Sequence, residues 1–150
     1  MVYNNLELEN ATIGRGGYRN FKGEKGQYNP AGKRTFVILL DEATGRKLED
    51  EGWHIRWREP RNEDDEPEAL LTVEVKFGEY PPKIVLISGG QKTYLDESNI
   101  AILDNAEIAN ADIIVRPYNW EVNGNQGVKA YVKSMYVTLE DDDFGGKYRD

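Results

Sequence analysis

The chain has 150 residues, a length typical of a single domain, and its hydrophobic content of 39% is sufficient for an ordered core. It contains no Cys and a single His, His54, which excludes disulfides, thiolate nucleophiles, iron–sulfur clusters, Cys-based zinc sites and multi-histidine metal centres. No apolar run approaches the roughly 18 residues of a membrane span, and residues 1–5 lack the features of a signal peptide. We therefore expect a soluble, intracellular protein.

The net charge of −8 is unevenly distributed along the chain. Residues 11–36 contain six cations and one acid, which gives this segment a net charge of +5, whereas the rest of the chain carries −13. Since Lys and Arg drive the binding of nucleic-acid phosphates, this segregation allows a nucleic-acid partner despite the acidic total.

Apolar residues alternate with a period of two along most of the chain, which predicts mainly β-strands. The expected strands span 6–15, 33–40, 53–58, 70–77, 83–88, 92–95, 112–122 and 128–139. A short helix is expected over 41–52, with Asp41 as its N-cap and Gly52 just past its end, and another near 98–104. The Gly-rich residues between the first two strands are expected to form a long mobile connection.

This order of elements favours a mostly β fold, a small OB-fold-like barrel, over the alternative of a two-sheet β-sandwich. We expect the barrel to occupy residues 1–139 and residues 140–150 to form a disordered acidic C-terminal tail.

The Gly-rich segment combines basic residues with aromatic ones, and we define it as the basic loop, residues 14–34. Single-stranded nucleic acid requires this combination, because cations follow the phosphates while aromatic rings stack on exposed bases. Alternatively, the aromatic rings pin the loop to the barrel and the cations are simply solvated. The candidate contacts are Arg15, Tyr18, Arg19, Phe21, Lys22, Lys25, Tyr28, Lys33 and Arg34.

A second candidate surface is the hairpin formed by the last two expected strands. A four-residue turn at 123–126 pairs Trp120 with Lys129, Tyr118 with Tyr131 and Arg116 with Lys133, all on one face. The opposite face then carries Ile113, Val115, Val128, Ala130 and Val132. The hairpin is thus predicted to have a buried side and an aromatic, basic side, unless its aromatic residues form a second small core.

The strand at 53–58 shows the same alternation. Trp53, Ile55 and Trp57 are expected in the core, which leaves Arg56 and Arg58 on the other face as candidate phosphate contacts.

A catalytic function is not expected, because no nucleophile elbow or Ser, His and Asp arrangement is present. No cofactor or metal is expected either, since the Gly-rich segment lacks a complete dinucleotide fingerprint or P-loop. Asp141, Asp142 and Asp143 with Phe144 are expected either to compete with nucleic acid for the cationic groove and dock on partner proteins, or only to aid solubility.

Several runs of this sequence resemble a family of single-stranded DNA-binding proteins of tailed bacteriophages. The matching positions are 19–21, Gly23, Gly26, 28–34, 51–53, 81–82, 116–118 with Trp120, and 127–131. The resemblance implies an OB-fold and non-catalytic coating of single-stranded DNA in the cytoplasm of the infected bacterial host, during phage replication, recombination or repair. It also implies an acidic tail that modulates binding. The alternative function is that of a phage structural or protein-interaction domain whose aromatic hairpin face is a subunit interface.

Overall fold

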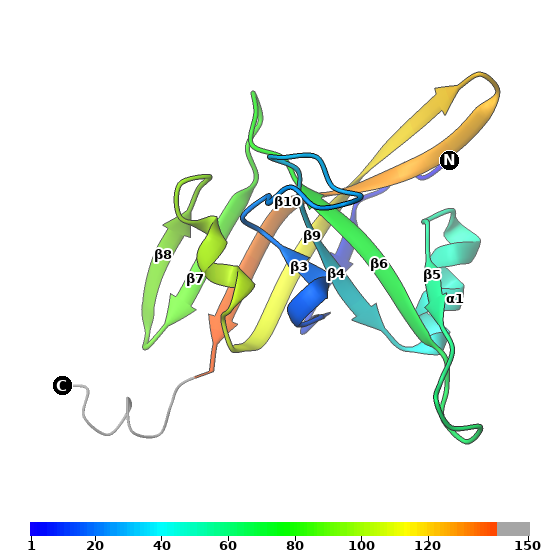
Figure 1. The fold of residues 1–150 in the computed structure, drawn as a ribbon, viewed down its shortest axis with the longest axis horizontal. Coiled ribbons are helices and arrows are strands. Elements are labelled where there is room, and N and C mark those ends of the chain that lie inside the picture. Colours follow the sequence, from blue (N-terminus) through cyan, green and yellow to red (C-terminus); the bar gives the residue numbers. More distant parts are fainter. Residues whose placement is uncertain (141–150) are drawn as a thin grey trace.

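The first strand of the protein is broken in two, and this break allows the sheet to close on itself. The computed structural model describes residues 1–140. In it β1 (Leu6–Leu8) pairs with β9 (Ile108–Val122), while β2 (Thr12–Ile13) pairs with β4 (Arg34–Leu40). The sheet runs in the order β1-β9-β10-β6-β4-β2, so both of its ends belong to the same short segment. The sheet therefore curls into a small, partly open barrel (Figure 1), which confirms the OB-fold-like expectation over the sandwich.

The other strands extend or flank this barrel (Figure 1). They are β3 (Arg19–Asn20), β5 (Arg56–Arg58), β6 (Glu68–Val75), β7 (Lys83–Ser88), β8 (Gln91–Leu95) and β10 (Asn125–Leu139). Two 3₁₀ helices, η1 (Gly16–Tyr18) and η2 (Ile100–Asp104), lie in the connections. β7 pairs in parallel with the second half of β10, and β8 pairs only with β7.

The alternating apolar residues point into the barrel as predicted. Phe36, Val73, Val115 and Met135, each from a different strand, are fully buried in one hydrophobic cluster. Burial of apolar area at roughly 25 cal/mol per Å² is the main force that holds the sheet in this curved form.

The predicted helix is confirmed as α1 (Glu42–Glu51) beside β5 and β6. The Asp41 side chain accepts a hydrogen bond from the Thr44 backbone N–H (2.7 Å), and Gly52 adopts φ 112° just past the last turn. Gly45 permits the close packing, because a Cβ there would lie 2.3 Å from the Ala69 Cβ. No helix within residues 1–140 is long and apolar enough to cross a membrane.

Several expected boundaries differ from the structure. The single strand expected at 6–15 is interrupted at Asn10, whose φ of 54° turns the chain. The second expected helix is the 3₁₀ helix η2, and the strand expected at 53–58 is reduced to β5. Both hairpin strands begin earlier than expected, at Ile108 and Asn125, because they pair with each other along almost their whole length.

Candidate nucleic-acid interface

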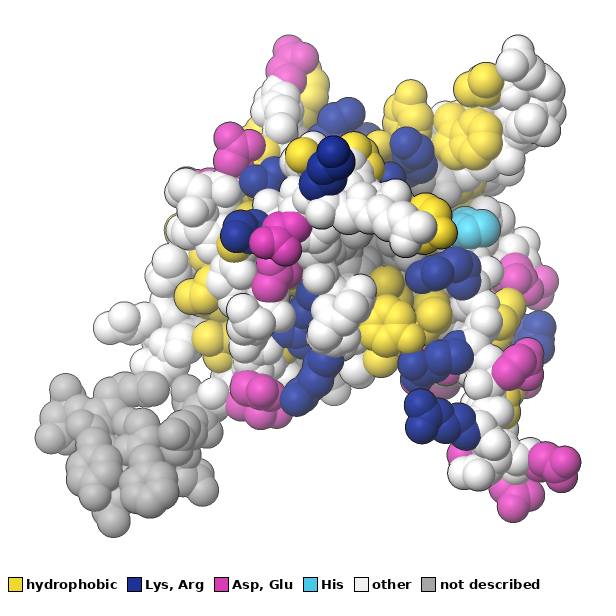
Figure 2. Space-filling model, viewed as in Figure 1, with side chains coloured by type: hydrophobic (Ala, Val, Ile, Leu, Met, Phe, Trp, Pro, Cys, Tyr) yellow, Lys and Arg dark blue, Asp and Glu magenta, His cyan; other side chains and the backbone are white. Residues whose placement is uncertain are grey.

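The basic loop and the β9–β10 hairpin, far apart in sequence, meet on the outer face of the barrel. Residues from both line a single hollow at the end of β6. Its lining is Gly32, Lys33, Arg34, Glu74, Val75, Lys76, Phe77, Glu97 and Lys129. Lys33 and Lys129 also line the adjacent depression over β6, together with His54 and Thr72. Figure 2 shows Lys and Arg side chains next to hydrophobic ones on the face that β4 and β6 present in Figure 1.

The hairpin turn is shorter than predicted. Asn123 and Gly124, with φ of 52° and 83°, form a two-residue turn between Val122 and its partner Asn125. The predicted cross-strand pairs are therefore wrong by two residues, because a two-residue turn with both φ positive fits the twist of the strands better than a four-residue turn. The observed pairs are Trp120 with Gly127, Tyr118 with Lys129 and Arg116 with Tyr131.

A shift of two residues leaves each side chain on its predicted face, because side chains alternate with a period of two. Ile113, Val115, Ala130 and Val132 are buried in the core, as expected. Arg116, Tyr118, Trp120, Lys129 and Tyr131 share the outer face. The predicted pair of Lys133 with Arg116 is absent, because Arg116 pairs with Tyr131, and Lys133 itself lies at a β-bulge between Val132 and Ser134.

The aromatic residues of the hairpin are exposed to different degrees. Tyr118 is 50% exposed, whereas Tyr131 beneath it is 8% exposed and contacts it edge to face, with ring centroids 6.0 Å apart. The Arg116 guanidinium lies 5.4 Å from the Tyr131 ring centroid. Burial, and secondarily the negative charge of Glu74, raises the pKa of Tyr131. Tyr131 therefore supports Tyr118 and Arg116, and the expectation that its own ring stacks on a base is wrong in this conformation.

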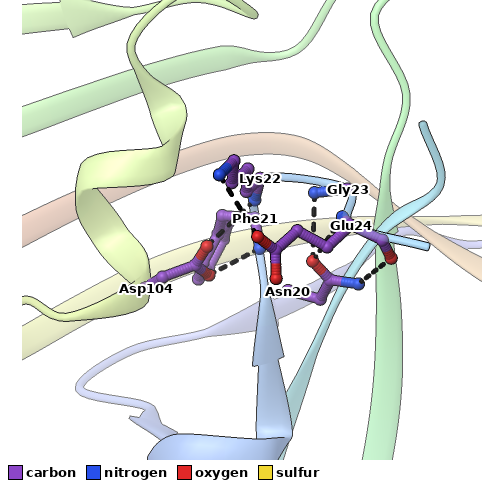
Figure 3. Close-up of polar contacts among 6 residues, drawn as sticks. All are labelled: Asn20, Phe21, Lys22, Gly23, Glu24 and Asp104. Carbon is purple, nitrogen blue, oxygen red and sulfur yellow. Dashed lines mark hydrogen bonds and ion pairs between the residues drawn. The ribbon is translucent and has the colours of Figure 1, made fainter. Parts of the chain in front are cut away.

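Side-chain hydrogen bonds anchor the first part of the basic loop. The backbone N–H groups of Phe21 and Lys22 donate to the Asp104 carboxylate of η2 (2.6 and 3.0 Å), as Figure 3 shows. The Asn20 side chain accepts from the N–H groups of Gly23 and Glu24 (3.0 and 2.9 Å), also drawn in Figure 3. These side chains replace the hydrogen bonds that regular secondary structure would supply.

Two residues of the loop have structural roles. Phe21 is fully buried and stacks on Phe36 with ring centroids 4.9 Å apart, so the prediction that it stacks on bases is wrong. Arg19 donates to the carbonyl oxygens of Gly14, Leu103 and Ala106 (2.7, 3.1 and 2.7 Å). Burial, reinforced by neighbouring Arg15, lowers the pKa of Arg19. Its guanidinium thus fixes the loop to the end of η2, and Arg19 also lines an open hollow beside Lys22.

The remaining loop residues project outward. Tyr28 is 91% exposed at the tip. Lys22 and Lys25 line a second hollow beside Gly16 and Gly17, where Lys22 also contacts Glu24 (3.2 Å). Arg15 forms an ion pair with Glu107 (2.9 Å), which partly neutralises it.

Tyr18 and the two Arg residues of β5 extend this face beyond β6. The Arg58 guanidinium donates to the Tyr18 hydroxyl (2.7 Å) and forms an ion pair with Glu68. Arg56 makes a long contact with the Thr72 hydroxyl (3.5 Å) and is exposed. Tyr18 can fold back here because Gly14 has no side chain, and a Cβ at Gly14 would lie 2.7 Å from the Tyr18 Cβ. The expected core positions of Trp53 and Ile55 are confirmed, with Trp57 partly buried against the same core.

Residues at the end of β6 belong to the face but were not predicted. The Arg34 guanidinium lies over the Phe77 ring, 5.5 Å from the ring centroid. Lys76 lines the same hollow. Glu74 lies between Thr35 of β4 and Tyr131 of β10 in the sheet. The alternation Val73, Val75 already places Glu74 and Lys76 outward, so this part of the site was available from the sequence.

The family model described as "Putative phage ssDNA-binding domain" matches residues 1–150. The chain belongs to this family of phage single-stranded DNA-binding domains. Membership agrees with the expectation of a non-catalytic binding protein. No curated protein sequence gives a match.

Solved structures of single-stranded DNA-binding proteins share the fold of this phage ssDNA-binding domain. The C-terminally truncated protein of bacteriophage Enc34 gives a TM-score of 0.59 at 13% identity, over 92% of this chain and 87% of that one. The same Enc34 protein in complex with ssDNA gives 0.58 at 14% identity, over 94% and 89% of the two chains. At such low identity the similarity concerns the fold alone.

No group of three or more His, Cys, Asp or Glu residues within positions 1–140 of this phage ssDNA-binding domain is arranged to hold a metal ion. The expected tail contacts at Asp141, Asp142, Asp143 and Phe144 lie outside the described residues.

Proposed function

We propose that this chain binds single-stranded DNA, without strong sequence preference, across the outer face formed by the basic loop, β5, β6 and the β9–β10 hairpin. The observation that carries the proposal is the shared hollow in which Lys33 and Arg34 of the loop meet Lys129 of the hairpin. None of these three cations forms an ion pair within the described residues, so their charges are available to phosphates.

Both the basic loop and the hairpin that supply these cations also carry aromatic rings. Tyr28 and Tyr118 are well exposed, and the Trp120 indole lies over Gly127 at the hairpin tip. Stacking of a base on such a ring is worth about 1 to 3 kcal/mol and does not depend strongly on which base is present. A cationic groove flanked by exposed rings thus suits a flexible single strand better than a duplex, whose bases are stacked inside.

This activity would coat and protect single strands during phage DNA replication, recombination or repair, in the cytoplasm of the infected host. Family membership and the Enc34 complex with ssDNA support the proposal. The acidic tail would compete with DNA for the groove and bind phage or host replication proteins. Stopping the chain after Leu139 should then strengthen DNA binding, and unchanged affinity would reject the competition.

The test is fluorescence anisotropy of a labelled single-stranded oligonucleotide at several salt concentrations, with a duplex of equal length alongside. Four phosphate contacts predict that log affinity falls with log salt at a slope of about −3. Tyr118→Ala should weaken binding by at least about 1 kcal/mol, whereas Tyr3→Ala, an exposed ring beside α1, serves as the matched control. Absence of binding at low salt would reject the proposal and favour the protein-interaction alternative for the hairpin face.

A further inference from the structure

The β-bulge at Lys133 changes which residues of β10 face outward. Before the bulge Val132 pairs with Val115, and after it Ser134 pairs with Ile114. As a result Val132, Met135 and Val137 are all buried in the core although they do not share one alternation. Tyr136 is thereby turned to the outer face, the same face as Tyr131, while strict alternation from Tyr131 would have directed it inward.

Tyr136 has an aromatic and basic neighbourhood on this face. It pairs with Val85 of β7, which in turn pairs with Tyr94 of β8, so the three side chains form one row across the sheet. Tyr94 is 67% exposed. Lys83, two residues before Val85 and on the same face, has its Nζ 5.5 Å from the Tyr136 ring centroid. Lys92 lies two residues before Tyr94, so it also faces outward.

The charge of Lys83 is well maintained in this position. Hydrogen bonding to the Tyr136 hydroxyl, with smaller contributions from the charges of Tyr136 and Tyr94, raises the pKa of Lys83. Neither Lys83 nor Lys92 forms an ion pair within residues 1–140. On the side away from β7, Tyr136 pairs with Asp112 of β9, and this acidic side chain would repel phosphates. The cations thus define a path on the β7–β8 side of β10.

We propose that the single-stranded DNA surface continues along β10 past the bulge and onto the β7–β8 hairpin. There Tyr94 and Tyr136 stack on bases while Lys83, Lys92 and Lys133 contact phosphates. This inference rests on the proposed function, because it extends the same binding face. The two parts of the surface are connected by β10, on which Tyr136 follows Tyr131 by five positions, or about 16 Å along a strand.

The extension should be occupied only by a strand long enough to reach it. The test measures the affinity of the full chain for oligonucleotides of about 6 and about 20 nucleotides, one near the short end and one beyond the long end of the roughly 4 to 16 nucleotides bound by one OB fold. The variant is Tyr94→Ala with Lys92→Ala, two exposed positions whose replacement leaves the core untouched. The matched control is Tyr3→Ala with Lys47→Ala, an exposed ring and an exposed cation beside α1.

We expect the variant to lose about tenfold in affinity for the long oligonucleotide, the effect of one stacked base and one phosphate contact. Its affinity for the short oligonucleotide should match that of the control. If the variant loses equal affinity for both oligonucleotides, or loses none for either, the extension is overturned. In both cases, binding by the wild-type chain would still support the proposed function. If the wild-type chain binds neither oligonucleotide, the proposed function and the extension both fail.

Discussion

The Trp120 indole lies across Gly127, its cross-strand partner at the tip of the β9–β10 hairpin. A Cβ on Gly127 would lie 2.4 Å from the Trp120 Cζ2, so the indole occupies the place of a side chain there. Gly in a strand usually weakens it, and here the absent side chain leaves room for a large aromatic ring.

Gly127→Ala should therefore displace Trp120 and weaken single-stranded DNA binding by about 1 kcal/mol, the lower value for one stacked base. Trp fluorescence and oligonucleotide anisotropy measure the two effects. Gly78→Ala is the matched control, since a Cβ at that position meets no atom within 4 Å. Undiminished binding by Gly127→Ala would show that the position of Trp120 is not important for DNA.

Lys33→Ala and Lys129→Ala should each make the salt dependence of binding less steep. Each phosphate contact on a single strand contributes about 0.7 to the magnitude of the slope of log affinity against log salt. The slope of the double variant should therefore be smaller in magnitude by about 1.4. Lys47→Ala on α1 is the control and should keep the wild-type slope. A double variant with an unchanged slope would remove the shared hollow from the DNA path.

Asp104→Ala should loosen the basic loop, because the N–H groups of Phe21 and Lys22 would lose their acceptor. Loss of a hydrogen bond to a charged group predicts a free energy of unfolding lower by about 1.5 to 3 kcal/mol. Chemical denaturation measures this loss, and hydrogen exchange should show faster exchange at both amides. Glu107→Ala on the neighbouring surface is the comparison, because its exposed ion pair with Arg15 contributes at most about 1 kcal/mol. Unchanged exchange at Phe21 would contradict the anchoring role.

Asp41→Ala should destabilise the protein by about 1 kcal/mol at neutral pH through loss of the α1 N-cap. Hydrogen bonding to Thr44 lowers the pKa of Asp41 below its ordinary 3.8 in the folded state. The contribution of the Asp41 carboxylate to stability is thus complete above the unfolded-state pKa and disappears as the pH falls through the folded-state pKa. Denaturation of the wild-type and Asp41→Ala proteins at neutral pH and at about pH 3 should show a smaller difference in the free energy of unfolding at the lower pH. Asp50→Ala, an exposed acid on the same helix, should show a smaller difference. A difference that persists at low pH would mean that the carboxylate charge is not its source.

The basic loop shows where sequence reasoning about the site reached its limit. Its composition identified Lys33, Arg34 and Tyr28, which the structure places on or beside the candidate face. It could not distinguish them from Phe21 and Arg19, since burial against Phe36 and hydrogen bonds to η2 come from segments distant in sequence.

The fold class and the helix cap could be predicted from the sequence alone, because alternation and capping depend on residues close together in the chain. The sequence also determined the outward face of the hairpin, which a two-residue error in register does not change. Three features could not be predicted without the three-dimensional structure: the barrel closure at Asn10, the bulge that turns Tyr136 outward, and the meeting of Lys33 with Lys129. Each of these depends on pairing between distant strands, in which one inserted or left-handed residue redirects every side chain that follows.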